Sequence, residues 1–333
     1  MKRAVLFSFT DRGAETAGRI AAALTGGFET LLLSPRGDLK EAVAENFNTA
    51  DALVFVGACG IAVRAIAPYV VSKTTDPAVI SVDELGRYVI PLLSGHIGGA
   101  NELAHLIADR LDSTAVITTA TDINSRFSVD AWAHGQGLVI SDMNTAKRFS
   151  AEILKRDLPL YSDVRIYGDV PKGLYRGMLG DLGAAVTYRT AEPFETTLAL
   201  IPRILHVGIG CRRGTSSKDI CAAVSRVFTE NGLRLEAIAC VASIDVKSDE
   251  AGLLAACTEL GADIRFFTAE ELNSLEGSFT LSEFVRSVVG VDNVCERAAV
   301  CSAGKGASLI VKKNGLDGVT VAVAAENRRY SFE

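Results

Sequence analysis

The sequence predicts an α/β protein with two α/β domains and largely parallel sheets. Three observations support this fold class. The 333 residues are enough for about two domains of ~150 residues each. Hydrophobic residues make up 48% of the chain and aromatic residues only 7%, which is typical of sheets filled with aliphatic side chains. Short apolar runs alternate with amphipathic stretches, as in βαβ units.

The N-terminal α/β domain is expected over residues 1–122. Its strands and helices alternate in the order RAVLFSF, ETAGRIAAAL, FETLLL, DLKEAVAENF and ALVFV. The run AVISVDELGRYVIPLL differs, because two β-rich segments flank a short Glu-Leu-Gly turn, and this predicts a hairpin inserted in the sheet. TAVITTATD then returns to a strand followed by a loop.

Periodicity weakens over residues 123–202. A helix at AKRFSAEILKR, short extended pieces such as LPLYSD and several glycines predict a connector or small middle unit. A strand, a glycine-rich loop and an amphipathic helix begin again at RILHVGIGCRRGTSSKDICAAVSRVFTENG. The C-terminal α/β domain is therefore expected over residues 203–333.

Composition excludes several classes of function. The formal net charge of -6 gives no broad footprint for nucleic acid, so an anionic ligand would need a local basic cluster. No apolar run approaches the ~18 residues of a membrane-spanning helix, and the N-terminal apolar stretch is too short for a signal peptide, so we expect a cytoplasmic protein. The seven cysteines contain no C-x-x-C pair and have no histidine at zinc-finger spacing, which predicts reduced thiols.

Five loops carry the candidate chemistry. In open α/β sheets, ligands bind beyond the carboxyl ends of strands, where helix N-termini favour anions. The loops are rich in glycine or hydroxyl residues: FTDRGAE (9–15), VGACGIAVR (56–64), SGHIGGAN (94–101), TTATD (118–122) and VGIGCRRGTSS (207–217). No G-x-S-x-G, H-E-x-x-H or P-loop signature occurs, which argues against common serine hydrolases, zinc proteases and P-loop phosphotransfer enzymes.

His96 stands out because Gly95, Gly98 and Gly99 flank it. The missing side chains would let a bulky ligand approach the backbone while the imidazole projects into the same space. The alternative is a histidine that only makes a hydrogen bond within a tight turn.

GIGCRRG, residues 208–214, places two guanidinium groups after a strand, as in sites that bind carboxylates or phosphates. The loop also resembles a dinucleotide fingerprint, but the acidic residue expected ~20 residues further on is missing, since the next strand ends at Asp245. A nucleotide-binding module is therefore disfavoured.

Two long segments, VGACGIAVRAIAPYVVSKTTDPAVISVDELGRYVIPLLSGHIGGANELA and AVITTATD, resemble the N-terminal signature of the CbiG family, the cobalt-precorrin-5A hydrolases of anaerobic cobalamin biosynthesis. HVGIGCRRGTSS, SIDVKSDEAGLL, VCERAAV and VTVAVA resemble the C-terminal domain of that family. Arg297 stands where the E-x-A-A pattern of the family has a small residue. The likeness covers most of the chain outside the middle segment.

The resemblance implies a reaction: the δ-lactone of cobalt-precorrin-5A opens, and a two-carbon fragment leaves as acetaldehyde to give cobalt-precorrin-5B. Hydrolysis needs an activated water and an oxyanion donor, and fragmentation of the resulting alcohol needs a base. We assign His96 as the base and the backbone amides of residues 98–101 as oxyanion donors. Asp83 is a candidate to orient His96 or activate water, or else a turn-forming aspartate. Glu102 is a third catalytic candidate, or else a charge that stabilises a helix N-terminus.

The implied substrate is a large macrocycle with several carboxylates. Its expected contacts lie in the glycine and threonine loops, at basic positions and in SIDVKSDEAG. They are Gly57, Gly60, Arg64, Lys73, Gly98, Gly99, Asn101, Thr119, Asp122, Gly210, Cys211, Arg212, Lys247, Glu250 and Lys305. The alternative for Arg64, Lys73 and Arg212 is a solvated surface charge, and the alternative for Lys247 and Glu250 is a helix start. A helix N-terminus and Arg212 would lower the pKa of Cys211 if that thiol were reactive, the alternative being a structural cysteine.

Cobalt enters as part of the substrate, so the resemblance implies no cofactor and no metal site on the protein. Expected partners are the polycarboxylate macrocycle cobalt-precorrin-5A, transient contacts with neighbouring methyltransferases of the pathway, and a second copy in a homodimer. Nucleic acid and membranes are not expected partners. A non-catalytic protein that binds and carries a cobalt-corrinoid intermediate remains the alternative function.

Overall fold

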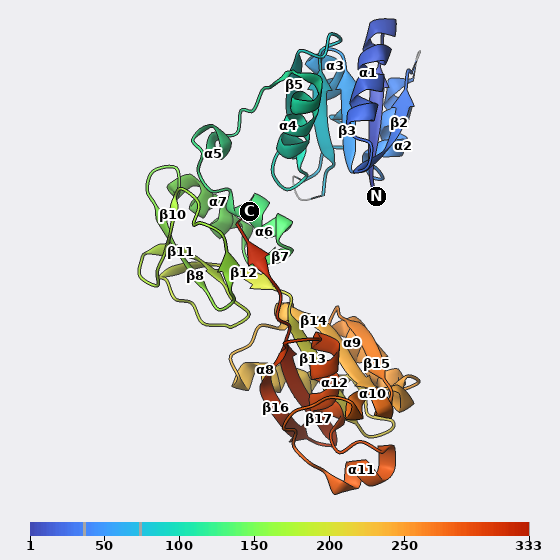
Figure 1. Ribbon diagram of the computed structural model, residues 1–333, viewed down its shortest axis with the longest axis vertical. Helices are drawn as coiled ribbons and strands as arrows, with labels where there is room; N and C mark the ends of the chain where they lie inside the picture. The colour runs from blue at the N-terminus through green and yellow to red at the C-terminus, as the bar shows by residue number, and fades with distance from the viewer. Residues whose placement is uncertain (36–37, 73–74, 333) are drawn as a thin grey trace. The chain divides into compact units, whose positions relative to one another are not determined.

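The computed structural model describes residues 1–35, 38–72 and 75–332, and Lys73 lies outside these ranges. The chain forms two compact units (Figure 1). The first comprises Met1–Gly135 with Ile153–Lys155, and the second comprises Gln136–Glu152 with Arg156–Glu333. Within the described part of the chain, no helix has both the length and the apolar character needed to cross a membrane.

The first unit is built on a six-stranded sheet in the order β2-β1-β3-β4-β5-β6. Its strands are β1 (Lys2–Ser8), β2 (Phe28–Leu33), β3 (Ala52–Val56), β4 (Ala78–Val82), β5 (Tyr88–Leu93) and β6 (Thr114–Ala115). Its helices are α1 (Asp11–Ala23), α2 (Leu39–Phe47), α3 (Cys59–Ile66), α4 (Ala100–Leu111), α5 (Ala120–Ile123) and α6 (Val129–Gly135). All neighbouring strands are parallel except β4 and β5, which confirms the predicted hairpin.

Strand β1 is buried on both faces, as expected of a central parallel strand. Side chains alternate between the faces, so Ala4 and Leu6 pack in the core beside α1 and α4, whereas Val5 and Phe7 pack beside α2 and α3. The Phe7 ring stacks on Phe55 of β3 with a centroid separation of 4.8 Å. Helices therefore cover both faces of the sheet (Figure 1). Ligands can approach it at the loops that lie beyond the two ends of the strands.

The antiparallel direction of β5 decides which loops meet. Leu93, the last residue of β5, pairs with Val79 near the start of β4, and β6 runs parallel to β5. Residues 94–101 and 116–122 therefore follow strands that end where β1, β3 and β4 begin. The loops at 9–15 and 56–64 follow the opposite ends of β1 and β3. The loop that carries His96 therefore shares one edge of the sheet with the TTATD loop, opposite the edge that carries the loops at 9–15 and 56–64.

The second unit contains a five-stranded sheet in the region expected to be a connector or small middle unit. Its order is β10-β8-β11-β12-β7, with only β7 antiparallel to its neighbour. Its elements are β7 (Leu138–Ile140), α7 (Met143–Glu152), β8 (Leu158–Ser162), β10 (Leu174–Arg176), β11 (Leu182–Val186) and β12 (Thr196–Pro202). Strands of three to seven residues carry little periodicity, so the middle segment holds more structure than the sequence predicted.

The third sheet has the order β15-β14-β13-β17-β16, in which β13, β14 and β15 are parallel and β17 is antiparallel to both neighbours. Its strands are β13 (Leu205–Cys211), β14 (Ile238–Ile244), β15 (Asp263–Phe267), β16 (Ser308–Leu316) and β17 (Val319–Ala325). Its helices are α8 (Ser217–Glu230), α9 (Ala251–Glu259), α10 (Ala269–Asn273), α11 (Glu283–Val289) and α12 (Val294–Ala303), with short 3-10 turns at Leu235–Ala237 and Asp245–Lys247. A short ribbon pairs β9 (Ile166–Tyr167) with β18 (Tyr330–Ser331).

Helix α12 packs unusually close to β13. A Cβ atom on Gly208 would overlap the backbone carbonyl of Cys295 and crowd the amide of Ala299. The small residues of VCERAAV thus allow the helix to approach the strand. Arg297, which departs from the family pattern, contacts Asp292 and Phe279. Its Nε donates to Oδ1 of Asp292 at 2.8 Å, and its guanidinium carbon lies 4.4 Å from the centre of the Phe279 ring.

Candidate functional site

The loop that carries His96 is held by its own backbone. Ser94 follows β5 with a φ of 56° and is buried, and its Oγ donates to the carbonyl oxygen of Asp76 at 3.0 Å. Gly99, with a φ of 78°, precedes the first residue of α4 in the left-handed region that favours glycine. Its amide donates to the carbonyl of His96 at 2.9 Å. The loop is therefore a tight, defined turn into α4.

Two of the flanking glycines serve packing within this loop. A Cβ on Gly95 would lie 2.8 Å from Oδ1 of Asn101, and a Cβ on Gly98 would lie 2.9 Å from the carbonyl oxygen of Ser94. Only Gly99 has no atom within 4 Å of its Cβ position. The Cβ directions of Gly95 and Gly98 are thus filled by the loop itself.

The backbone amides expected to form an oxyanion hole are largely occupied. The amide of Ala100 donates to Ser94 and that of Asn101 donates to Gly95, at 3.1 and 2.9 Å, and Gly99 donates to His96. An amide that already donates within the turn is not free for a developing oxyanion. The expectation of an oxyanion hole at residues 98–101 is therefore wrong for these three amides.

The His96 imidazole lies between two carboxylates. Its Nε2 is 3.1 Å from Oδ2 of Asp122 and 3.3 Å from Oγ1 of Thr121. Its Nδ1 is 3.0 Å from Oγ of Ser128 and 3.4 Å from Oδ1 of Asp130. The imidazole is 17% exposed, so solvent reaches it only in part. His96 thus makes far more contacts than a turn histidine needs.

The direction of one hydrogen bond assigns the tautomer. Ser128 Oγ donates to Oδ1 of Asp130 at 3.0 Å, so the same oxygen accepts from Nδ1–H of His96. Because the Asp122 carboxylate can only accept, Nε2–H donates to it in the imidazolium, and Nε2 is the nitrogen that exchanges a proton. The hydrogen bond and charge of Asp130, with a smaller contribution from Asp122, raise the pKa of His96 above its usual value, although burial opposes the shift.

Asn101 and Thr119 hold the second carboxylate. Nδ2 of Asn101 donates to Oδ2 of Asp122 at 2.7 Å and to Oγ1 of Thr119 at 3.0 Å. Asp122 is 34% exposed, whereas Asp130 is only 9% exposed. The structure therefore brings together four predicted residues, His96, Asn101, Thr119 and Asp122, with Asp122 as the accessible acid.

Sequence reasoning missed Ser128 and Asp130, and it included Thr121 only as one hydroxyl residue of the TTATD loop. Ser128 and Asp130 belong to RFSVDAW at the start of α6, more than 30 residues after His96. A serine two residues before an aspartate at a helix start is the one local signal there, and it is shared with ordinary helix caps. Nothing in the pattern links it to a distant histidine.

A cavity of about 510 Å³ opens beside the His96 loop. Gly98, Gly99 and Glu102 line it together with the first residues of β1, β3 and β4, so it lies at the amino edge of the sheet. Glu102 is an exposed residue in the first turn of α4. The wall of this cavity is partly apolar, which suits a ligand with a hydrocarbon surface. The apolar residues are Phe28, Ile97, Leu103 and Leu106.

Asp83 lies at the opposite edge of the sheet. Its carboxylate accepts from the amides of Leu85, Arg87 and Tyr88 and so closes the hairpin turn. The five residues of β4, at about 3.3 Å each, put about 16 Å between this edge and the one reached by His96. The expectation that Asp83 orients His96 is therefore wrong, and a role in water activation stays a prediction.

Gly57 and Gly60 also belong to that opposite edge. Gly57 lines a smaller cavity of about 280 Å³ with Asp83, and a Cβ on Gly57 would lie 2.8 Å from the Phe9 ring. The exposed Arg64 folds back so that its guanidinium is 3.4 Å from the Cβ position of Gly60. The structure thus separates these three candidates from the His96 network.

In the second unit, two predicted loops meet. Glu250, 5% exposed, accepts from the amide of Gly214 at 2.7 Å and pairs with Nζ of Lys247 at 3.2 Å. Both charges act on Cys211, but burial is the larger effect and raises the pKa of that thiol. The lowered pKa considered for Cys211 is therefore wrong. Glu250 and Lys247 hold the GIGCRRG loop in place.

Gly210, Arg212 and Lys305 complete the predicted set. Gly210 is packed against Thr320, which donates to its carbonyl at 3.2 Å, and the exposed Arg212 follows β13. Lys305 precedes β16, whose first residue, Ser308, pairs with Ala325 opposite the start of β13. Lys305 and Arg212 therefore lie at opposite ends of this sheet.

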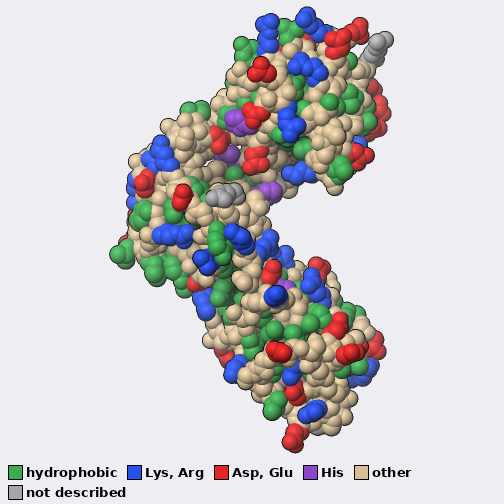
Figure 2. Space-filling model, in the orientation of Figure 1, with side chains coloured by type: hydrophobic (Ala, Val, Ile, Leu, Met, Phe, Trp, Pro, Cys, Tyr) green, Lys and Arg blue, Asp and Glu red, His purple; other side chains and the backbone are tan. Residues whose placement is uncertain are grey.

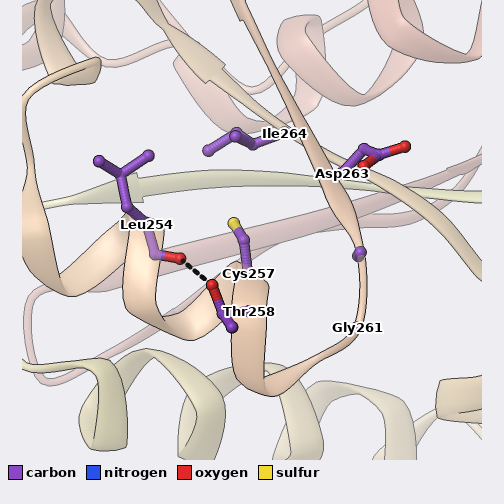
Figure 3. A pocket seen from close by; sticks show the side chains of 7 residues that line it. Leu254, Cys257, Thr258, Gly261, Asp263 and Ile264 are labelled. Carbon is purple, nitrogen blue, oxygen red and sulfur yellow. Dashed lines mark hydrogen bonds between the residues drawn. The ribbon is translucent and has the colours of Figure 1, made fainter.

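A further pocket of about 430 Å³ lies between α9 and β15 (Figure 3). Thr258 Oγ1 donates to the Leu254 carbonyl at 3.2 Å, so this hydroxyl is satisfied within its helix. Burial raises the pKa of Cys257 to about 12, which leaves a poor nucleophile. Across the described residues, His, Cys, Asp and Glu side chains form no group of three or more suited to a metal ion.

Comparison with known proteins adds to this geometry. Residues 41–122 match the family model described as Cobalamin synthesis G N-terminal, and residues 205–324 match Cobalamin synthesis G C-terminus. The chain is 33% identical over 345 residues to cobalt-precorrin-5A hydrolase of Salmonella typhimurium, covering 96% of this chain and 97% of that protein. It is 29% identical to cobalt-precorrin-5A hydrolase of Priestia megaterium, covering 86% and 82% of the two chains.

Among solved structures, a cobalamin biosynthesis protein G homolog from Sulfolobus solfataricus is 22% identical, covers 97% of each chain and gives a TM-score of 0.43. The identity to the Salmonella protein over nearly the whole of both chains confirms the resemblance seen in the motifs. The chain belongs to the CbiG family of cobalamin synthesis proteins.

Proposed function

We propose that this protein is a cobalt-precorrin-5A hydrolase, which opens the δ-lactone of its substrate and releases acetaldehyde to give cobalt-precorrin-5B. The observation that carries the proposal is the 33% identity, over 96% of the chain, to a protein named for that activity. The His96 network supports it, because an imidazole fixed between two carboxylates is equipped to move protons.

The first step is hydrolysis of the lactone. Water attacks the lactone carbonyl carbon while Nε2 of His96 takes one of its protons. The ester C–O bond then breaks, which leaves a carboxylate on the macrocycle and a secondary alcohol on the two-carbon fragment. Because Nδ1–H is held by Ser128, Nε2 is the nitrogen presented for this transfer.

The second step is fragmentation of that alcohol. A base removes the hydroxyl proton, a C=O bond forms, and the carbon–carbon bond to the macrocycle breaks. The electron pair of the broken bond goes to the ring carbon, which takes up a proton as acetaldehyde leaves. His96 can serve as the base in both steps once the proton that it takes up in the hydrolysis, released with the new carboxylate, has passed to solvent. In the fragmentation, the imidazolium then returns the hydroxyl proton to the ring carbon.

The two carboxylates stabilise the imidazolium that forms in these steps. Asp130 does so from a buried position through Ser128, and Asp122 does so from the accessible side, where Asn101 fixes its orientation. Because a base must begin neutral, the raised pKa of His96 places the active form at higher pH. We assign Asp130 and Ser128 as positioning residues.

We further propose that the protein needs no cofactor of its own, because cobalt arrives within the macrocycle. Turnover that persists after dialysis against EDTA supports this, and turnover that depends on added metal contradicts it. A homodimer, transient contacts with methyltransferases of the pathway and a cytoplasmic location also remain proposals. Sedimentation of the purified protein tests the dimer directly.

The decisive experiment incubates the purified protein anaerobically with cobalt-precorrin-5A, follows the mass of the macrocycle and traps acetaldehyde. A hydrolase yields trapped acetaldehyde and a product whose mass has gained water and lost acetaldehyde. A carrier protein, the alternative function, binds the macrocycle stoichiometrically and leaves its mass unchanged.

A further inference from the structure

A macrocycle with several carboxylates requires a local cluster of basic side chains, because the chain as a whole carries a net charge of -6. The basic residues predicted from the loops do not form one. Arg212 and Lys305 lie at opposite ends of the third sheet, and Arg64 belongs to the first unit. These three residues therefore cannot supply the cluster.

Such a cluster lies on the ribbon formed by β9 and β18. Tyr330 pairs with Ile166 and Ser331 with Tyr167, so Arg329 and Arg165 precede paired residues and lie side by side. Their guanidinium carbons are 4.3 and 4.8 Å from the centre of the Tyr167 ring. Figure 2 shows Lys and Arg side chains gathered over β18 and the strands beside it.

Two further arginines join this surface, which we name the arginine ribbon (Arg165, Arg176, Arg328 and Arg329). Arg176, at the end of β10, donates from Nη2 to the carbonyl oxygen of Ile166 at 3.0 Å. Arg328 lies over the ring of Tyr330 at 5.8 Å. All four arginines are exposed, and they converge from two segments more than 150 residues apart.

Within the described part of the chain, the arginine ribbon has no counter-charge. Among the residues that the structure describes, none of the four guanidinium groups has a carboxylate within ion-pair distance. Asp163, two residues before Arg165, already accepts from Tyr161 and Thr187. Like charges held side by side without a carboxylate repel one another, so an anion bound there would be favoured.

Stacking prepares these groups for carboxylates. Cation–π contact uses the flat face of a guanidinium and leaves its N–H edge free for two parallel hydrogen bonds to one carboxylate. Because the Tyr167 ring already restricts both neighbours, less conformational freedom is lost when a ligand binds. A pair of oriented guanidinium groups thus fits two carboxylates on one rigid scaffold.

We propose that the arginine ribbon is a binding site for the carboxylate side chains of the macrocycle. The chemical class, a tetrapyrrole-derived polycarboxylate, rests on the proposed function, whereas the preference for carboxylates rests on the ribbon itself. The surface lies in the middle segment and the C-terminal tail, outside the residues matched by either family model.

Binding can be measured without turnover. Uroporphyrin, a stable tetrapyrrole with acetate and propionate side chains, is titrated into the full-length protein by isothermal calorimetry. Arg165→Gln/Arg329→Gln should weaken binding by about tenfold or more, since each loses a charge-assisted hydrogen-bonding group. The matched control, Arg156→Gln/Arg226→Gln, removes two ion-paired arginines elsewhere in the second unit and should leave the Kd within about twofold.

A second pair of variants separates stacking from charge. Tyr167→Phe keeps the ring and should retain affinity, whereas Tyr167→Leu keeps every charge and should weaken binding severalfold.

Equal Kd values for Arg165→Gln/Arg329→Gln and its control would overturn the proposal, as would binding that is insensitive to salt. Uroporphyrin binding that depends on the ribbon in a protein that releases no acetaldehyde would support the site and remove the hydrolase. Normal turnover with an unchanged KM in Arg165→Gln/Arg329→Gln would remove the site and leave the hydrolase.

Discussion

Gly98→Ala tests whether the packing of the loop positions His96. The new Cβ would lie 2.9 Å from the carbonyl oxygen of Ser94 and closer still to its Cβ. Against a normal separation of about 3.5 Å, the shortfall is at least about 0.6 Å. Ser94 cannot move away freely, because it is buried and its Oγ is bonded to Asp76. The loop that carries the imidazole must therefore shift.

Two magnitudes follow from this clash. Overpacking of this kind costs about 1–3 kcal/mol of folding free energy, measurable by urea unfolding. A displacement that approaches ~1 Å at a catalytic group lowers kcat by on the order of 10²-fold. Rates of acetaldehyde release from cobalt-precorrin-5A give the second number, with enzyme held at a temperature where the variant is folded.

Gly26→Ala is the matched control in the same unit. Gly26 has a φ of 92°, and no atom lies within 4 Å of its Cβ position, so alanine there brings backbone strain of about 1–2 kcal/mol without a clash. The control should lose comparable stability and keep kcat. A Gly98→Ala enzyme as active as Gly26→Ala would refute the reasoning that this turn places His96.

Two further predictions concern charged groups. Asp130→Asn should lower the pKa of His96, read by NMR titration, and move the rising limb of kcat/KM to lower pH, because the base must be neutral. In the wild type, the raised pKa of His96 means that its protonation stabilises the folded state. This stabilisation is complete below the unfolded-state pKa and is lost as pH rises through the folded-state pKa. Asp130→Asn should make the free energy of unfolding depend less on pH in this range, and an unchanged pH dependence would contradict the role given to Asp130. Glu296→Ala removes a fully buried carboxylate that accepts from the amides of Thr280 and Lys313 at 2.8 and 2.7 Å, so unfolding in urea should show a loss of about 3 kcal/mol. A loss under about 1 kcal/mol would mean that water satisfies those donors.

Much of the fold could be predicted because its signals are local. The apolar runs of β1 and β3 and the amphipathic stretches of α1 and α2 lie where periodicity placed them. The hairpin followed from two β-rich runs around a turn. A hairpin reverses the chain, so its presence already implies that residues 94–101 lie at the opposite edge from the loop at 56–64.

The middle sheet was less predictable. Its strands β7 and β10 have only three residues each, and β8 and β11 have five, so neither length nor alternation distinguishes them from loops. LPLYSD was expected to be extended and forms β8, and the apolar runs at β11 and β12 were the other available signals. Their pairing depends on contacts across the sheet, which local patterns do not encode.

The candidate site was predictable only in part. His96, Asn101, Thr119 and Asp122 lie in loops rich in glycine or threonine, and the structure brings them together. Ser128 and Asp130 reach the same imidazole through the tertiary fold, with no spacing that links them to it. Similarly, the glycines beside His96 could be recognised, but their use for packing depends on neighbours in three dimensions.

The central claim is that the His96 network carries out the hydrolysis, and His96→Gln tests it most directly. Glutamine keeps hydrogen-bonding capacity within the loop but cannot take up a proton at neutral pH. A single-turnover experiment with excess enzyme should show macrocycle bound with near wild-type affinity and no acetaldehyde trapped. Acetaldehyde released at the wild-type rate would contradict the account and remove His96 from the mechanism.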